Sequence, residues 1–200
     1  LELSSWPAAD LAPVLAALQH HPALQRIHLV LGLFGSLSGL ELLLRSQDSK
    51  VKELILERVD IRTVGFYPVM EELERNTTVT NLAIRDSVLS REDAQRVKSM
   101  LRQNTALQCL DLTSSGLEST GLEEIASVLY RNTSIKTLDL SSNFLYDIES
   151  ANVLRELIRR NKTITSLCLY GINFGRNAAA ARSIFEGVRS NNTLQQLDIE

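Results

Sequence analysis

Few residues in this chain could carry out chemistry. There are three histidines and two cysteines, namely His20, His21, His28, Cys109 and Cys168. None has the spacing of a metal-binding motif or of a nucleophile with its base, and glycine-rich nucleotide loops, the serine elbow of hydrolases and the HExxH zinc motif are absent from the sequence. The sequence therefore predicts a protein that is not an enzyme and that uses no cofactor or metal.

Two acidic residues, Asp111 and Asp139, occupy equivalent places in two similar stretches of sequence. If these stretches form neighbouring strands, the two carboxylates lie roughly 5 Å apart. Such a pair suits a basic group of a partner or a weak cation site. An acidic residue is ordinary at this place in such repeats, so we expect no special role for the pair.

The elements that must position these residues belong to a repeat. A short pattern of apolar residues, clearest at Leu107, Leu110 and Leu112, recurs through the whole chain. Its first residue falls at Leu24, Val51, Val79, Leu107, Ile135, Ile164 and Leu194, with spacings of 27, 28, 28, 28, 29 and 30. A fixed period of this length is typical of a solenoid, in which each unit buries its apolar face against the next.

Each repeat reads as a short strand, a turn, a helix and a second turn. Apolar residues alternate in the strand, and residues such as Leu122, Ile125, Ala126 and Leu129 then follow at helical spacing. Ser119 or Thr120 is available as the N-cap of that helix, and Ser90 with Asp93 forms a capping box one repeat earlier. The apolar stretch 11–18 is expected to be the first helix.

An asparagine marks the end of the expected helices, at Asn76, Asn104, Asn132, Asn161 and Asn191. Four of these, all but Asn104, also begin a glycosylation motif. Because the asparagine recurs with the repeat, we interpret it as a cap that closes each helix in the left-handed conformation, and not as a glycan acceptor.

These features resemble the leucine-rich repeat family, in its ribonuclease-inhibitor-like subclass. The tag of asparagine and threonine before each strand, as at 104–105, is similar to repeats of NOD-like receptors, and the subclass also includes the tropomodulins. The resemblance implies an α/β fold, a right-handed horseshoe solenoid with a parallel sheet on the concave face and helices on the convex face. We expect residues 1–200 to form one domain, with about six full repeats and partial repeats at both ends, cut from a larger protein.

One family feature is mostly missing. The asparagine that bonds to the neighbouring turn after each strand is present only as Asn143. Serine at 87 and 115 can partly replace it, but Val59 and Ile172 have no polar side chain. Irregular turns are expected after those two strands.

Composition limits the partners. The chain is 44% apolar with a net charge of −3, which describes a folded protein without the dense basic surface that nucleic acid requires. It has no apolar run long enough to insert into a membrane. The two cysteines fall on strands two steps apart, roughly 10 Å, so they should be free thiols in a reducing compartment, the cytoplasm.

Side chains that point away from the core on successive strands are the candidate protein-binding residues. They are Arg26, His28, Val30, Glu53, Ile55, Glu57, Asn81, Arg85, Asp111, Asp139 and Tyr170. Val30 and Ile55 read as exposed aliphatic side chains, which near arginine and tyrosine are typical of an interface hot spot. The alternative is that both merely fit an irregular strand.

The sequence thus predicts a non-catalytic module that recognises a protein partner through its concave face. The first hypothesis is the sensing or partner-binding region of a larger intracellular protein of immune-receptor or effector type. The alternatives are a substrate-recruiting arm for a ligase, kinase or GTPase domain elsewhere, or a cytoskeletal or assembly scaffold that binds an abundant polymer.

Overall fold

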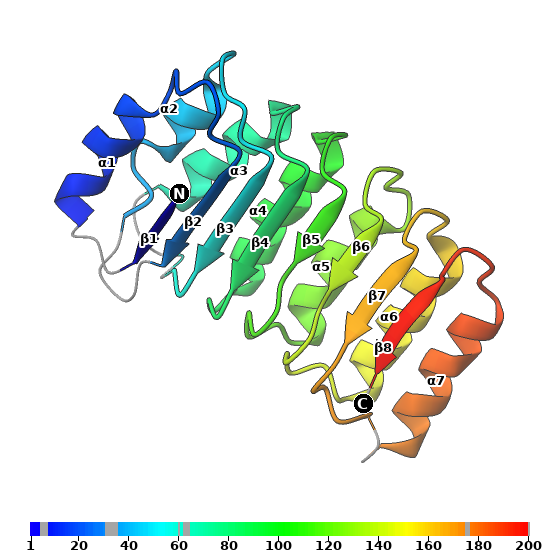
Figure 1. Ribbon diagram of the computed structural model, residues 1–200. Helices are drawn as coiled ribbons and strands as arrows, with labels where there is room; N and C mark the ends of the chain where they lie inside the picture. Colours follow the sequence, from blue (N-terminus) through cyan, green and yellow to red (C-terminus); the bar gives the residue numbers. More distant parts are fainter. Residues whose placement is uncertain (5–7, 31–35, 60, 62–64, 175–176, 200) are drawn as a thin grey trace.

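The computed structural model describes residues 1–4, 8–30, 36–59, 61, 65–174 and 177–199. Strands and helices alternate along this part of the chain and stack side by side (Figure 1). The strands are β1 (Glu2–Ser4), β2 (Arg26–Val30), β3 (Glu53–Glu57), β4 (Asn81–Arg85), β5 (Cys109–Asp111), β6 (Thr137–Asp139), β7 (Ser166–Leu169) and β8 (Gln196–Ile199). The helices are α1 (Ala8–Ala17), α2 (Leu40–Arg45), α3 (Phe66–Arg75), α4 (Arg91–Gln103), α5 (Ser119–Leu129), α6 (Ile148–Arg160) and α7 (Ala178–Arg189).

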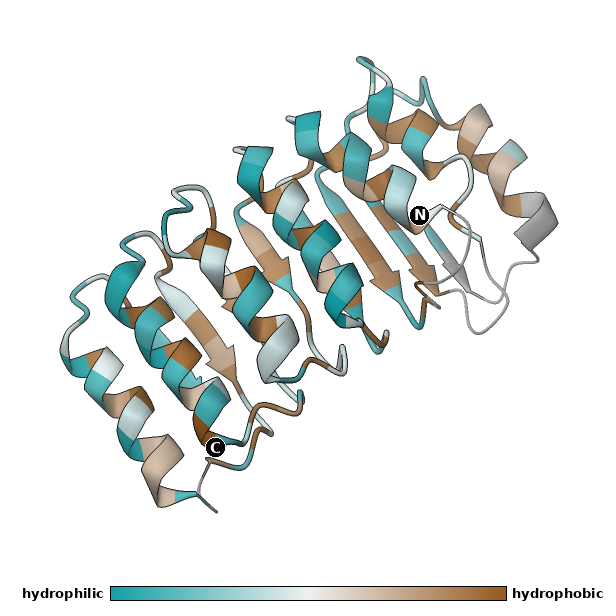
Figure 2. Ribbon diagram, turned by 180° about the vertical axis from the view of Figure 1, so that it is seen from behind, coloured by the Kyte–Doolittle hydropathy of each residue, from teal (hydrophilic) through white to brown (hydrophobic). Residues whose placement is uncertain are grey.

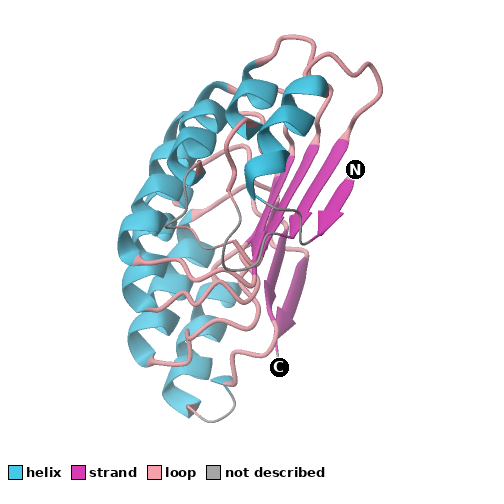
Figure 3. Cartoon of the chain, turned by 90° about the vertical axis from the view of Figure 1, so that its left-hand side faces the viewer, coloured by secondary structure: helices cyan, strands magenta, loops and turns pink. Residues whose placement is uncertain are grey.

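All eight strands run parallel in one sheet, and their order in the sheet is their order in the chain. The helices form a second layer that covers one face of the sheet and leaves the other face open (Figure 3). This arrangement confirms the predicted fold class, a right-handed α/β solenoid of the leucine-rich repeat type. We call the uncovered side of the sheet the open face; it is the concave side of the solenoid.

The core is one continuous layer between sheet and helices. Alternate strand residues point into it, and the strand register aligns them in rows, such as Leu54, Leu82, Leu110, Leu138 and Leu167, all buried. The helices present their apolar residues to the same layer and polar residues to solvent (Figure 2). Burying one such leucine contributes about 1.5–3 kcal/mol, and no unit buries its leucines without its neighbours.

The helix starts agree with only part of the prediction. The capping box at the start of α4 is confirmed, because Ser90 accepts from the backbone N–H of Asp93 and the Asp93 carboxylate accepts from that of Ser90. The predicted cap at Ser119 or Thr120 is wrong. Helix α5 already includes both residues, and Glu118 stands before it with no side-chain cap bond.

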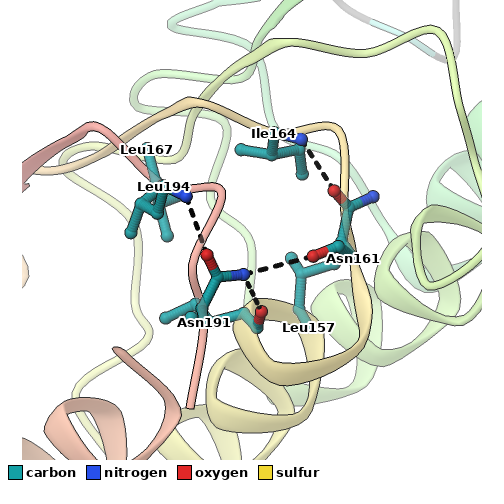
Figure 4. A pocket seen from close by; sticks show the side chains of 7 residues that line it. Leu157, Asn161, Ile164, Leu167, Asn191 and Leu194 are labelled. Atoms are coloured by element: carbon teal, nitrogen blue, oxygen red, sulfur yellow. Dashed lines mark hydrogen bonds between the residues drawn. The ribbon is translucent and has the colours of Figure 1, made fainter. Parts of the chain in front are cut away.

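The helix ends are closed by asparagine, as predicted, but by a different mechanism. Asn76, Asn104 and Asn161 are extended at the helix C-terminus, with φ near −70°. The prediction of a left-handed cap is therefore wrong, and the side chain closes the helix instead. Asn161 Oδ1 accepts from the backbone N–H of Ile164 at 2.7 Å (Figure 4). Its Nδ2 donates to the Leu129 carbonyl at 2.7 Å.

The same bonds recur from repeat to repeat and join neighbouring units. Asn191 accepts from Leu194 N–H and donates to Asn161 O (Figure 4). Asn76 likewise donates to the buried Leu44 carbonyl. A glycan would attach to this same Nδ2 atom, which is engaged inside the folded repeat. The recurrence thus follows from the fold.

A second ladder runs along the turns after the strands, and serine substitutes for asparagine in it. Ser87 Oγ accepts from Val59 N–H at 3.0 Å, and Ser115 Oγ lies 2.8 Å from the Ile84 carbonyl. Asn143 both accepts from Leu117 N–H and donates to the Leu112 carbonyl. Each turn is therefore tied to the turn beside it.

The described residues show irregular turns in neither of the two predicted places. Arg58, beside Val59, has the same left-handed conformation as Asp86, Ser114 and Ser142, so the described part of that turn is regular. Val59 N–H donates to the side chain of Ser87 in the next repeat, as Leu117 N–H donates to that of Asn143. After β7, Gly171 and Asn173 have positive φ, and Ser114 and Gly116 have positive φ at the equivalent places after β5, so the turn around Ile172 repeats that of β5.

Candidate protein-binding surface

The open face is built from the strand residues that point away from the core. The register places them in rows across the sheet, as the sequence predicts. One row contains Glu2, His28, Ile55, Ala83, Asp111, Asp139, Cys168 and Asp198, and another contains Arg26, Glu53, Asn81, Cys109, Thr137, Ser166 and Gln196. A third begins with Val30, Glu57 and Arg85. Ten of the eleven candidate residues therefore share one surface, and Tyr170 lies immediately after β7.

Ion pairs join β2 and β3 on this face. Arg26 Nε lies 3.1 Å from Glu53 Oε2, and His28 Nε2 lies 3.0 Å from Glu57 Oε2. Arg26 and Glu53 stand opposite each other in the strand register, and Glu57 stands two residues beyond Ile55, the register partner of His28. The pairs hold four of the candidate side chains in defined positions before any partner arrives.

The prediction that Ile55 is an exposed aliphatic contact is wrong. Its side chain lies on the open face but is only 2% exposed. It is flanked in its strand by Glu53 and Glu57, whose side chains are themselves pinned to β2. Val30 is partly buried, so of the two aliphatic side chains only Val30 reaches solvent on this face.

At the centre of the face, an ion pair connects β4 and β5. Arg85 lies 2.6 Å from Asp111 Oδ2, and Asp111 Oδ1 accepts from the backbone and hydroxyl of Thr113. Burial opposes the charge of Arg85, but its hydrogen bond to Asp111 and the neighbouring carboxylates together raise the pKa of the guanidinium. Arg85 and buried Asp111 thus hold the sheet together before they serve any partner.

Strands β5, β6 and β7 carry one thiol, Cys109, one further carboxylate, Asp139, and a second thiol, Cys168, in that order. Asp139 is partly exposed and accepts from the backbone N–H of Ser141. Cys109 and Cys168 are free, as predicted, and Ser141 Oγ lies 3.0 Å from Cys168 Sγ. Burial first, and then the charges of Asp111 and Asp139, raise the pKa of the Cys109 thiol. A thiol that stays protonated is a weak nucleophile.

The balance of charge on the open face is acidic. Its described strand residues include two arginines, Arg26 and Arg85, and both are already paired with carboxylates. The carboxylates are Glu2, Glu53, Glu57, Asp111, Asp139 and Asp198. Of the candidate residues, Arg26, Asn81 and Tyr170 are the most open to solvent.

Sequence reasoning missed a second group of accessible side chains. Val88, Phe144 and Tyr146 are exposed in the loops that lead from strands to helices, near Tyr170 in the same set of loops. One feature of the sequence could have indicated them. Val88 and Phe144 occupy equivalent places in their repeats, and each directly precedes a leucine that is buried, Leu89 or Leu145. We call Val88, Phe144, Tyr146 and Tyr170 the aromatic rim.

The described part of the chain contains no group of three or more histidine, cysteine or acidic residues placed to hold a metal ion. Within those same residues, no helix has the length and apolar character to cross a membrane.

No protein-family model and no curated protein matches this sequence. Its fold is similar to a solved structure described as leiomodin-1 actin-binding site 2, with a TM-score of 0.60 at 20% identity, covering 66% of this chain and 76% of that one. It is also similar to the tropomodulin C-terminal domain of Caenorhabditis elegans, with a TM-score of 0.56 at 14% identity, covering 66% and 80%. At these identities the similarity shows the fold, a leucine-rich-repeat-like solenoid.

Proposed function

We propose that this chain is a non-catalytic module that binds a protein partner through the open face of its sheet. The observation that carries the proposal is the continuous eight-stranded face, on which charged and polar side chains stand in aligned rows. A surface of this breadth suits a macromolecule. Its excess of carboxylates favours a partner that presents basic groups, because complementary charge directs encounter and register.

The ordered state of the face also supports binding. Arg26, His28 and Arg85 are already fixed by carboxylates in the free protein. Immobilising a long side chain on binding costs about 0.5–1.5 kcal/mol, and here the fold has met part of that cost. We further propose that the module works inside the cell, where Cys109 and Cys168 remain thiols, as the partner-binding region of a larger protein.

A cytoskeletal role is the second candidate. Its support is the similarity in fold to leiomodin-1 actin-binding site 2. Co-sedimentation with actin filaments and a binding assay with monomeric actin test it directly. This candidate is supported if the chain binds either form of actin and if substitutions on the open face weaken that binding. An absence of binding to both forms eliminates actin and leaves the broader proposal standing.

The broader proposal is tested by photo-crosslinking from two surfaces. A photoreactive amino acid replaces Asn81, which is exposed on the open face, or Glu123, which is exposed on α5 on the opposite side. We expect a defined protein adduct from position 81 in cell extract and none from position 123. Adducts only from position 123 would show that the helical face binds the partner.

Charge variants complete the test, and the structure decides which are informative. Reversing Arg85 would leave Asp111 buried without its partner, so a loss of binding could follow from misfolding. Asn81→Arg and Asp139→Asn change exposed or partly exposed groups and preserve the core. Each should weaken the crosslinked partner's binding about tenfold, while circular dichroism and the melting temperature stay unchanged.

A further inference from the structure

Exposed large apolar side chains gather along one edge of this solenoid. All parallel strands point to the same edge, so the loops from strand to helix collect there (Figure 1). Val88 lies between β4 and α4, Phe144 and Tyr146 lie between β6 and α6, and Tyr170 follows β7. Val88 is 79% exposed and Phe144 is 58% exposed at equivalent places in loops two repeats apart, and Tyr146 and Tyr170 are each 57% exposed.

The loops that carry the aromatic rim are rigid. Phe144 N–H donates to the Leu117 carbonyl at 2.9 Å, and Ser142 N–H donates to the Tyr170 carbonyl at 2.8 Å. Leu89 N–H, directly after Val88, donates to the Ser115 carbonyl at 2.9 Å. The buried side chain of Asn143 binds three further carbonyls or N–H groups beneath Phe144. The apolar groups are therefore held out to solvent by a fixed framework.

Between Val88 and Phe144 the equivalent residue is Gly116. A Cβ added there would lie 3.5 Å from Val88 Cγ1, an ordinary contact, and glycine places no side chain beside the valine. Val88 and Phe144 stand two repeats apart, roughly 10 Å, which is wide enough for an inserted side chain. A hollow lined by Tyr146, Ile148 and Asn173 continues the apolar surface toward α7.

In the described part of the rim loops, the charged residues are acidic. The described residues of the loops 86–90, 112–118, 140–147 and 170–174 include Asp86, Glu118 and Asp147 but no lysine or arginine. Asp111 and Asp139 lie on the adjoining open face. An anionic lipid surface would be repelled here, whereas a cation beside an aromatic ring is attracted both by the carboxylates and by the ring face.

We infer that the aromatic rim binds a partner segment in which an apolar or aromatic side chain stands next to lysine or arginine. The apolar side chain enters the hollow beside Tyr146, and the basic group faces Asp139 and Asp147. This inference rests on the proposed protein-binding function and assigns the anchor of that interface. The open face then contributes charge and register, and the rim contributes most of the apolar contact.

The experiment uses a random peptide library displayed on phage and selected against the whole chain. We expect the selected peptides to contain lysine or arginine next to an apolar residue. Their affinity, measured by fluorescence anisotropy, should fall at least about tenfold for Phe144→Ser and for Tyr170→Ser. Phe185→Ser on α7 is the matched control, since Phe185 is 50% exposed but distant from these loops, and it should leave affinity unchanged.

The possible outcomes separate the two proposals. Peptides that bind the Phe144 and Tyr170 variants fully but lose affinity for Asn81→Arg would overturn the rim and retain the open face. Selected peptides that are acidic would also overturn the rim, as would self-association or binding to phosphatidylserine vesicles that Phe144→Ser abolishes. If no peptide is enriched over a blank surface, the rim proposal fails, and the crosslinking experiment alone decides the open face. Circular dichroism of each variant confirms folding, which is expected because the substituted side chains are exposed.

Discussion

Single buried asparagines carry an unusual share of the structure at the residue scale. Asn161 is only 2% exposed, and its amide satisfies backbone groups of two repeats at once. A buried polar group left without a partner costs about 1–3 kcal/mol, so one side chain here protects several groups. The asparagine is thus a structural connector between helix end and next strand.

Replacing Asn161 with alanine should lower the free energy of unfolding by about 3 kcal/mol, because the Ile164 N–H and the Leu129 carbonyl lose their partner. Urea unfolding followed by circular dichroism measures the change. Asn192→Ala is the matched control, since Asn192 is exposed in the equivalent turn of the next repeat. If the two variants differ by less than about 0.5 kcal/mol, the asparagine ladder does not stabilise the fold.

At the element scale, the packing of neighbouring helices depends on how closely they approach. A Cβ on Gly187 of α7 would lie 2.9 Å from the Arg155 carbonyl oxygen of α6, and backbone cannot move aside easily. A Cβ on Gly121 of α5 would meet only the end of the Leu117 side chain, at 3.1 Å. The two glycines therefore have different roles although both stand in helices.

Gly187→Ala should destabilise the protein by about 1–3 kcal/mol, because α7 must shift away from α6. Gly121→Ala should be neutral or stabilise by up to about 1 kcal/mol, because alanine favours the helix and Leu117 can adjust. Thermal unfolding of both variants is the measurement. Equal effects of the two substitutions would contradict this account of the helix contacts.

A network of charges connects α4 with α5. Hydrogen bonds from Gln95, Lys98 and Arg91 lower the pKa of Glu124 to about 2, and all three donors lie on α4. The folded carboxyl has a lower pKa than the unfolded one, so the stabilisation is complete above about pH 4.5 and is lost as the pH falls toward 2.

Glu124→Gln should therefore reduce stability at neutral pH, and the difference from the wild type should shrink below about pH 4.5. Urea midpoints measured from neutral pH down to about pH 3 test this. A difference that stays constant over the whole window would mean that the charge of Glu124 does not contribute.

Most strands and helices could be predicted from the repeat, because a single period determines the positions of the strand, the helix and the core leucines in every unit. The helix caps were less predictable. Whether Ser119 caps a helix depends on where the first turn closes, and Ser119 and Thr120 already belong to that turn. Ile55 lies between His28 and Ala83 of the neighbouring strands, and its burial follows from these neighbours, which no local pattern contains. The exposure of Phe144 depends on loop geometry, since it precedes a buried leucine in a similar apolar sequence.

At the scale of the whole molecule, the helical side and the sheet side have separate tasks. Helices bury the core and present a polar outer surface, while the sheet and its rim hold acidic and aromatic side chains in fixed positions (Figures 2 and 3). Because every repeat contributes one strand and one loop, a partner can contact several repeats at once. The central claim is that partners bind on the sheet side and its rim.

The most direct test of this claim is hydrogen–deuterium exchange of the whole chain, alone and with a partner recovered by crosslinking from any surface position. Amides in the strands already exchange slowly, so the informative ones lie in the loops 112–118 and 140–147. Slower exchange in these loops on binding, with α3, α4 and α5 unchanged, is the predicted result. Protection confined to the helices would contradict the account.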